Sequence, residues 1–261
     1  WEWQHGTGAA LMYGFSYDGV NRLTGTVQKQ KSGTTWSALT GSYLEKGITY
    51  DRNGNIKTLQ RTANGTTVDD LVYSYTGNQL TGLTENVRTS PSGDVYSSGS
   101  AAAGSYVYDK NGNMINDSRR ALNLSYNVLN LLSEVKTVGG ELKVKYDYLA
   151  DGTKLRVRDK GDVNGFDYVG SLTYKKSSMG LQLESASFGE GEIRANVSNG
   201  VGNEVNYFLT DHLGSVRVIV DGNGVVKERN DYYPFGGRYG VSGGNVDAGS
   251  RWKYNGKEDQ V

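Results

Sequence analysis

Hydrophobic and polar residues alternate over several short stretches of the chain. The stretch 142–148 places leucine, valine and two tyrosines on one face, and the alternation resumes over 154–158 after Ala-Asp-Gly-Thr. Because alternation with a period of two is typical of half-buried strands, residues 141–158 are predicted to form a β-hairpin. The stretches 215–220 and 225–229, separated by Asp-Gly-Asn-Gly, predict a second hairpin.

Turn signals separate such stretches along the chain. Asn-Gly pairs begin at Asn53, Asn64, Asn111, Asn164, Asn199, Asn223 and Asn255. Asn and Gly both tolerate positive φ, so each pair is expected to form a type I′ turn. Helical signals are poor, and even the apolar segment 121–135 is interpreted as strand and turn. The sequence therefore predicts an all-β fold, in which successive antiparallel β-hairpins coil into a curled sheet or partial β-shell with little or no helix.

A short phrase recurs along the chain. It consists of Tyr-Asp, two or three residues, then Asn or Gly-Asn, then a branched apolar residue. Close copies begin at Tyr17-Asp18, Tyr50-Asp51 and Tyr108-Asp109, and weaker copies at Tyr75, Tyr126 and Tyr146-Asp147. A repeated unit indicates a modular chain. The uneven spacing suits one hairpin per unit, with loops expected to be mobile at 88–105 and 236–249.

Composition narrows the possible classes of protein. The chain has 37 glycines, 19 tyrosines and 2 prolines, which favours many short strands joined by tight turns. Its 28 basic and 28 acidic residues cancel, so nucleic acid is not expected as a partner. With no cysteine, disulfides, thiolate metal sites and a cysteine nucleophile are excluded. No apolar run approaches the ~20 residues that span a bilayer, and the natural protein is expected to extend beyond both ends.

Several residue groups resemble catalytic or metal sites. Asp211, His212 and Ser215 are the residue types of a hydrolytic triad, but adjacent residues of a strand point to opposite faces, so Asp211 is not expected to orient His212. The other histidine, His5, lies far away in sequence, which gives no zinc site. The preferred interpretation of Asp211, His212 and Ser215 is a packed turn, and no catalytic residue is predicted.

Carboxylates and aromatic residues raise three other possibilities: a calcium site, a glycosidase site and a sugar-binding surface. The series beginning at Asp51 and Asp109 alternate oxygen ligands as calcium loops do, but glycine is at the fourth place and no glutamate stands at the twelfth, so hairpin turns explain them better. Three glutamates that could suggest a glycosidase are interpreted as solvated charges: Glu184, Glu190 and Glu192. No metal and no cofactor are predicted. Exposed tyrosines and four tryptophans could stack against sugars: Trp1, Trp3, Trp36 and Trp252.

These phrases resemble the repeats of the bacterial YD-repeat, or Rhs (rearrangement hotspot), family, most closely at 17–23. A more specific likeness lies in the last third of the chain, where three segments are similar to the Rhs core-associated signature. The matching residues are Tyr207, Asp211, His212, Leu213, Gly214, Ser215 and Arg217, then Tyr233, Pro234, Phe235 and Gly236, then Tyr254, Gly256, Lys257 and Glu258.

The resemblance implies both architecture and function. In the family, hairpins coil side by side into a hollow shell that holds a variable C-terminal segment, often a toxin. The repeats are expected to occupy 1–166 and the core-associated region 167–261, as one continuous structure. Tyrosine rings are expected to pack on those of neighbouring hairpins, and each aspartate to accept N–H groups within its own turn.

The expected function follows from this resemblance. The chain is expected to be a non-catalytic scaffold from a secreted or cell-surface protein. Its expected partners are its own upstream repeats and a downstream variable segment. A surface adhesin that binds carbohydrate or protein through exposed aromatic residues is the alternative.

Overall fold

The computed structural model describes residues 1–4, 6–87, 103–195, 203–239 and 249–259. These residues are almost entirely β-strand and turn, so the predicted all-β class of hairpin-connected antiparallel strands is confirmed. Within the described ranges there is no α-helix, only the 3₁₀ turns η1 (Lys160–Asp162) and η2 (Tyr254–Gly256), and thus no helix that could cross a membrane. The predicted loops at 88–105 and 236–249 lie mostly outside the described residues, as does the Asn199 turn.

The chain divides into two compact units. The first unit comprises Trp1–Tyr106, Ser118–Arg120 and Tyr232–Tyr239. One sheet of this unit has the order β1-β2-β3-β4, and a second ladder runs from β5 to β9. The strands are β1 (Glu2–Trp3), β2 (Leu11–Tyr17), β3 (Leu23–Ser32), β4 (Thr35–Ala38), β5 (Leu44–Tyr50), β6 (Ile56–Ala63), β7 (Thr66–Thr76), β8 (Gln79–Glu85), β9 (Ala103–Tyr108), β22 (Asp231–Tyr232) and β23 (Arg238–Tyr239).

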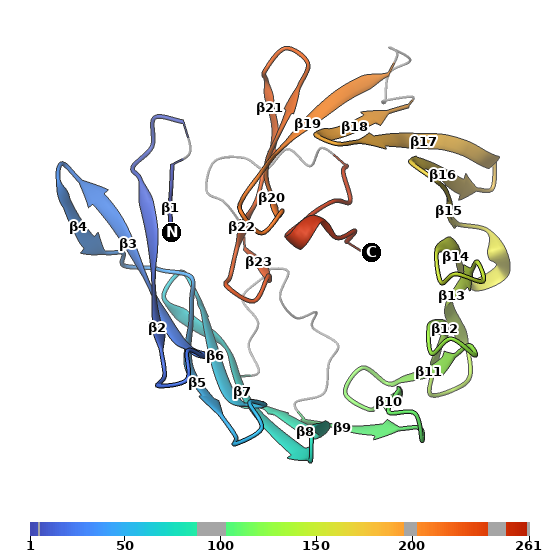
Figure 1. Ribbon diagram of the computed structural model, residues 1–261, viewed down its shortest axis with the longest axis horizontal. Coiled ribbons are helices and arrows are strands. Elements are labelled where there is room, and N and C mark those ends of the chain that lie inside the picture. Colours follow the sequence, from blue (N-terminus) through green and yellow to red (C-terminus); the bar gives the residue numbers. More distant parts are fainter. Residues whose placement is uncertain (5, 88–102, 196–202, 240–248, 260–261) are drawn as a thin grey trace. The chain divides into compact units, whose positions relative to one another are not determined.

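The second unit comprises Val107–Asp117, Ala121–Asp231 and Gly240–Val261. Each strand pairs antiparallel with the next one along the chain, and Figure 1 shows β11 to β19 succeeding one another along a curved path. The strands are β10 (Met114–Asp117), β11 (Leu122–Tyr126), β12 (Leu132–Thr137), β13 (Leu142–Tyr148), β14 (Lys154–Asp159), β15 (Gly165–Val169), β16 (Leu172–Ser177), β17 (Gly180–Phe188), β18 (Gly191–Arg194), β19 (Glu204–Thr210), β20 (Val216–Asp221) and β21 (Val226–Arg229).

A bulge recurs at the turn end of the hairpins. The pairing register shifts just before Tyr17, Tyr50, Tyr126 and Tyr148, each of which is the last or nearly last residue of its strand. A bulge adds one residue to one strand and increases the local twist. Repeating it hairpin after hairpin gives a physical reason for the ribbon of strands to curl.

Both predicted hairpins are present. The strands β13 and β14 pair across 142–159, and β20 pairs with β21 across 218–229. The segment 121–135 forms β11, a turn and part of β12, as predicted. The expected division at 166/167 falls inside β15, which pairs with β14 on both sides of it through Arg158 with Gly165 and Arg156 with Asp167.

Aromatic residues build the core of the first unit. Tyr13, Tyr233 and Tyr239 are buried together, with Trp1, Trp3, Tyr43 and Leu44 packed against them. The Tyr43 and Tyr239 rings stack with centroids 4.2 Å apart, and the Tyr13 hydroxyl donates to the Tyr43 carbonyl at 2.5 Å. Because Tyr233 and Tyr239 come from β22–β23, this short hairpin is part of the core of the first unit.

Candidate functional site

The repeated phrase folds into one particular hairpin turn, seen clearly at Asp51. Its carboxylate accepts the N–H groups of Asn53 at 2.8 Å and Asn55 at 2.9 Å. The Gly54 N–H donates to the Asp51 carbonyl, and Gly54 has φ +88°. A type I turn followed by a left-handed residue is the three-residue loop that produces a bulge in the strand. The predicted role of the aspartate within its own turn is thus observed.

The same turn occurs at Asp18 and Asp109. In each, one carboxylate oxygen accepts N–H groups two and four residues later at 2.9–3.0 Å. The pKa of Asp18 is lowered chiefly by the backbone N–H of Arg22, and that of Asp109 chiefly by the side-chain amide of Asn113. Donors aimed at the charged form keep these aspartates ionised.

The same turn forms at Asn127, in the weaker copy of the phrase predicted at Tyr126, and also at Asp211 and Asp221, where no Tyr-Asp phrase was found. Asn127, Asp211 and Asp221 each accept the same two N–H groups on a side-chain oxygen. Thr137 and Tyr233 have the same backbone turn, closed by Gly140 and Gly236 in the left-handed conformation. The turn therefore needs the left-handed residue and the backbone pattern more than it needs aspartate.

The repeat at Tyr146-Asp147 is displaced by two residues from its predicted place. The turn is formed by Leu149, whose carbonyl accepts the N–H of Gly152 at 3.0 Å, so Tyr148 occupies the tyrosine position. Asp147 lies within β13, where its carboxylate is 3.8 Å from Arg156 Nε. The sequence match at Tyr146 gave the wrong position because Tyr146-Asp147 is followed directly by Tyr148-Leu149, and the second pair forms the turn.

The predicted positive φ at both residues holds at Asn64–Gly65, with +49° and +77°, and at Asn255–Gly256, with +51° and +61°. It is wrong for several other Asn-Gly pairs. At Asn53, Asn111 and Asn223 only the following glycine has positive φ. The aspartate two residues before each asparagine holds that asparagine's N–H, which fixes the three-residue loop instead of the two-residue one.

Tyrosines join each hairpin to the one before it in the chain. The hydroxyl of Tyr50 donates to the Leu23 carbonyl at 2.6 Å, Tyr126 to Met114 at 2.9 Å, and Tyr148 to Leu132 at 2.8 Å. In all three cases the acceptor is the first residue after the preceding turn. At Tyr50 the Arg22 guanidinium also lies 4.5 Å from the ring centre. The expected ring-on-ring contact between neighbouring hairpins is thus replaced at Tyr50 by a hydrogen bond and a cation.

Asparagine amides add a second set of contacts between adjacent turns. The Asn113 amide donates to Asn130 at 3.0 Å, and the Asn55 amide donates to Asn78 at 3.2 Å. The same amides also hold the aspartate of their own turn, at 3.0 Å for Asp109. One side chain therefore closes its turn and fixes the spacing to the next one.

Replacing Tyr50 with phenylalanine is expected to lower the free energy of unfolding by about 1 kcal/mol, because the Leu23 carbonyl loses its side-chain donor. Urea unfolding measures the change. Tyr17→Phe is the control, since the Tyr17 side chain is 58 % exposed and should change stability by less than about 0.5 kcal/mol. Equal losses in the two variants would contradict the proposed contribution of the hydroxyl contact.

Asp51→Asn is expected to keep the turn and remove its sensitivity to acid. Asn127 already makes the same two bonds at 2.9 and 3.0 Å, so an amide oxygen suffices. The pKa of Asp51 is lowered in the folded chain, chiefly by the Asn55 amide, so its ionised form stabilises the fold above about pH 4 and this stability is lost as pH falls through the folded pKa.

Unfolding of Asp51→Asn and Asp51→Ala at neutral and acidic pH tests this prediction. The asparagine variant should match the parent at neutral pH and lose less stability on acidification, while the alanine variant should be less stable already at neutral pH. An asparagine variant as unstable as the alanine variant at neutral pH would disprove it.

The Asp211–Arg217 segment is a turn followed by the strand β20, so Asp211 and His212 lie in a turn, as the packed-turn interpretation expects. The Asp211 carboxylate holds the N–H groups of Leu213 and Ser215, both at 3.0 Å, while His212 and Leu213 are exposed and Gly214 has φ +81°. Ser215 is fully buried.

Arg217 and Tyr207 are the last and first residues of this part of the signature, and they lie in different environments. Arg217 forms a buried ion pair with Asp231 at 2.5 Å. Tyr207 lies on the other, exposed face, edge-on to Phe188 with ring centroids 5.9 Å apart. The contacts of the Asp211 carboxylate are with backbone N–H groups of its own turn.

The Tyr233–Gly236 segment covers a buried charged cluster in the first unit. Arg61 lies opposite both Glu45 and Asp69 in the β5-β6-β7 ladder, with Nε–O and Nη1–O distances of 2.7 and 3.3 Å. The Phe235 N–H donates to the other oxygen of Glu45 at 3.0 Å, and the Tyr233 hydroxyl donates to the Thr62 carbonyl at 2.7 Å. Pro234 follows Tyr233 at the turn position that proline favours.

Burial decides the pKa directions in this cluster. Glu45 is completely buried and Asp69 nearly so. Loss of hydration raises the pKa of both carboxyl groups, and the Arg61 guanidinium opposes that rise. A sequence signal for the cluster exists, because the two-residue period places Arg61 on the face of Leu59 and Asp69 on that of Leu71, both buried.

The last part of the signature packs on the second unit. Arg251 pairs with Glu184 at 2.9 Å and with Glu258 at 2.5 Å, and its guanidinium lies 3.5 Å from the Phe166 ring centre. Glu258 also accepts the Tyr168 hydroxyl at 2.9 Å, and burial raises the pKa of that hydroxyl. Tyr254 and Gly256 belong to the η2 turn, while Lys257 is exposed.

The glutamates considered as glycosidase residues do not act as one group. Glu184 is bound to Arg251, Glu190 is exposed, and Glu192 is buried with a raised pKa. All three are predicted from the sequence to be solvated loop charges. This is wrong for Glu192, because Glu192 lies in β18 and its side chain is on the buried face of that strand. Within the described ranges, no group of three or more acidic or histidine side chains has the geometry to hold a metal ion.

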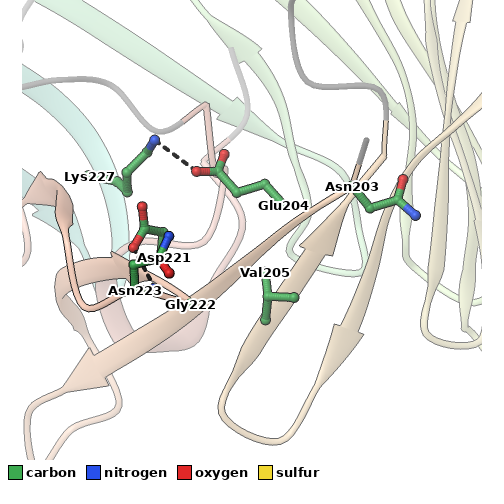
Figure 2. A pocket seen from close by; sticks show the side chains of 7 residues that line it. All are labelled: Asn203, Glu204, Val205, Asp221, Gly222, Asn223 and Lys227. Carbon is green, nitrogen blue, oxygen red and sulfur yellow. Dashed lines mark hydrogen bonds and ion pairs between the residues drawn. The ribbon is translucent and has the colours of Figure 1, made fainter. Parts of the chain in front are cut away.

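A shallow hollow lies beside the β20–β21 turn (Figure 2). It measures about 410 Å³ and is lined by Asn203, Glu204, Val205, Asp221, Gly222, Asn223 and Lys227. Lys227 Nζ lies 2.8 Å from Glu204, and this contact raises the pKa of the lysine. The Asp221 carboxylate accepts N–H groups of its own turn, and Lys227 forms an ion pair with Glu204. These charged groups of the hollow therefore already have partners within the chain.

Comparison with known proteins gives distant likenesses only. No family model matches the sequence, and no curated protein matches it. A structure of the Photorhabdus luminescens Tc holotoxin pore matches 96 % of this chain and 16 % of its own, at 17 % identity and a TM-score of 0.45. The TcdB2–TccC3 crystal structure matches 97 % of this chain and 19 % of its own, at 14 % identity and a TM-score of 0.44.

A porin-like protein from Bacteroides uniformis matches 86 % of this chain and 89 % of its own, at 12 % identity and a TM-score of 0.25. The chain thus spans less than a fifth of the Tc toxin chains that it resembles. The identities and TM-scores are too low for these likenesses to indicate function.

Proposed function

We propose that this chain is a non-catalytic structural scaffold, part of a secreted or cell-surface YD-repeat protein that encloses or presents a variable C-terminal effector or toxin. The observation that carries the proposal is the recurring turn with its tyrosine contact to the preceding hairpin, as at Tyr50, Tyr126 and Tyr148. In an array of repeated hairpins, the hydrogen bonds between one hairpin and the next hold the array together and extend it.

The state of the polar groups supports a role without catalysis. The Asp211 carboxylate is bound within its own turn, and the guanidinium groups of Arg61, Arg217 and Arg251 lie against carboxylates. A catalytic group needs a free position next to its substrate. The proposed partners are upstream repeats of the same kind and a downstream variable segment.

Protease protection tests the scaffold. In a chain that carries residues 1–261 and its natural downstream segment, that segment should resist protease under native conditions. Gly165→Leu should expose it, because a Cβ at Gly165 would lie 2.0 Å from the Val157 carbonyl oxygen and disrupt β14–β15 pairing. Gly189→Ala, where a Cβ meets nothing within 4 Å, is the control. Equal, rapid cleavage in all three proteins would refute enclosure.

A surface adhesin is the second candidate function. Phe188 and Tyr207 form an exposed aromatic pair, 36 % and 41 % accessible, of the kind that stacks against sugar rings. If this function is correct, a panel of glycans should contain a binder whose affinity falls at least tenfold in Tyr207→Ala. Binding that is unchanged by this substitution would exclude this pair as the site.

A further inference from the structure

A buried lysine, glutamate and asparagine meet in the second unit. Lys253 is 8 % exposed, Glu228 3 % and Asn230 1 %. Oε1 of Glu228 contacts Lys253 Nζ and also accepts the Asn230 side-chain amide at 2.8 Å. Both nitrogens therefore share one carboxylate oxygen, which brings the lysine amine next to the asparagine amide.

The backbone holds both side chains in place on β20. The Val216 N–H donates to the Lys253 carbonyl at 3.0 Å, and the Asn230 N–H donates to the Arg217 carbonyl at 2.8 Å. Because Val216 and Arg217 are neighbours, Lys253 and Asn230 are anchored at adjacent positions of one strand. Such fixed proximity makes a reaction between two groups effectively intramolecular.

Lys253 differs from the other lysines in its burial. Among the described residues it is the one lysine that is buried, whereas Lys160 and Lys227 pair with glutamates at exposed or half-exposed positions. A neutral, desolvated lysine is a nucleophile.

We propose that Lys253 and Asn230 form an intramolecular isopeptide bond, promoted by Glu228. The Lys253 ammonium transfers a proton to Glu228, and the resulting amine attacks Cγ of Asn230. Glu228 protonates the departing amide nitrogen and takes a proton from the attacking one. The Cγ–Nδ2 bond breaks, the Nζ–Cγ bond forms, and ammonia leaves with the carboxyl proton as ammonium, so no oxidant or cofactor is needed.

The bond would join the segment carrying Lys253 covalently to the end of β21. This cross-link is independent of the scaffold function proposed above, since it concerns one site rather than the repeats. It closes a loop between two residues of the second unit, and closing a loop limits the unfolded chain and so stabilises the folded one.

Mass spectrometry of the intact, denatured chain tests the proposal directly. The mass should be lower than that of the sequence by one molecule of ammonia. Trypsin should release a branched peptide that joins 230–238 to 252–257, because an acylated Lys253 is not cleaved. Asn-Gly pairs can also lose ammonia by forming succinimides, so the branched peptide is the deciding result. Separate linear peptides from the folded protein would overturn the proposal.

Variants assign the roles of the three residues. Lys253→Arg, Asn230→Ala and Glu228→Gln should all lack the branched peptide. Lys227→Ala, which removes a half-exposed lysine beside Glu228, should retain it. A branched peptide that persists in Glu228→Gln would overturn the role of Glu228. The result for the unaltered chain does not depend on whether any variant folds.

Discussion

Replacing Arg61 with methionine is expected to lower the free energy of unfolding by about 3–5 kcal/mol, because it leaves two buried carboxylates without their shared cation. Glu45 is fully buried, and Asp69 is 2 % exposed. Methionine keeps much of the side-chain volume, so the loss reports the charge rather than a cavity. Urea unfolding at neutral pH measures it.

The pH dependence of this variant has a definite sign. Burial already raises the pKa of Glu45 and Asp69, and removing Arg61 should raise both further. A carboxyl group with a raised folded pKa stabilises the fold most below its unfolded pKa and loses that contribution as pH rises through the folded pKa. The deficit of Arg61→Met should therefore shrink as the pH is lowered towards about 5.

Arg156→Met is the matched control for the Arg61 variant. Arg156 is 43 % exposed and lies 3.8 Å from both Asp147 and Asp167, so its loss should cost less than about 1 kcal/mol. If Arg61→Met costs no more than Arg156→Met, the buried cluster does not contribute as argued.

Gly191→Ala is expected to destabilise the second unit by about 3 kcal/mol or more, since the clash is with backbone. A Cβ at Gly191 would lie 1.9 Å from the Asn206 carbonyl oxygen and 3.0 Å from the Tyr207 Cα. Neither contact can be relieved by turning a side chain, so β18 and β19 would have to separate. Thermal and urea unfolding measure the loss.

Gly189 provides the control, two residues away in the same hairpin. A Cβ there meets nothing within 4 Å, so Gly189→Ala should change stability by less than about 0.5 kcal/mol. Similar stabilities for the two variants would show that β18 and β19 can adjust to a side chain at Gly191.

The strands and several turns could be predicted from the sequence because their signals are local. Alternation located the hairpins at 142–159 and 218–229, and the Tyr-Asp phrase located the turns at Asp18, Asp51 and Asp109. The turns at Thr137 and Tyr233 were missed because their backbone pattern needs only a left-handed glycine, which is common in this chain.

The buried ion pair of Lys253 and Glu228 could not be predicted from local signals. Lys253 and Glu228 are far apart in sequence, and each would be read alone as a solvated charge. Asp147 was assigned to a turn because its dipeptide matched, although pairing with β14 places it in a strand. Partner strands, rather than the residues' own neighbours, decide which side of a sheet is covered.

The tyrosine contacts give the array of hairpins a direction. In each pair the donor hydroxyl follows its acceptor carbonyl in the chain, as Tyr50 follows Leu23 and Tyr148 follows Leu132. During synthesis from the N-terminus, the acceptor carbonyl of one hairpin is made before the tyrosine hydroxyl that binds it. The hydrogen bond therefore forms only after the next hairpin has been synthesised. Growth in this order keeps each new contact short-range in sequence, which favours fast folding of one hairpin on the last.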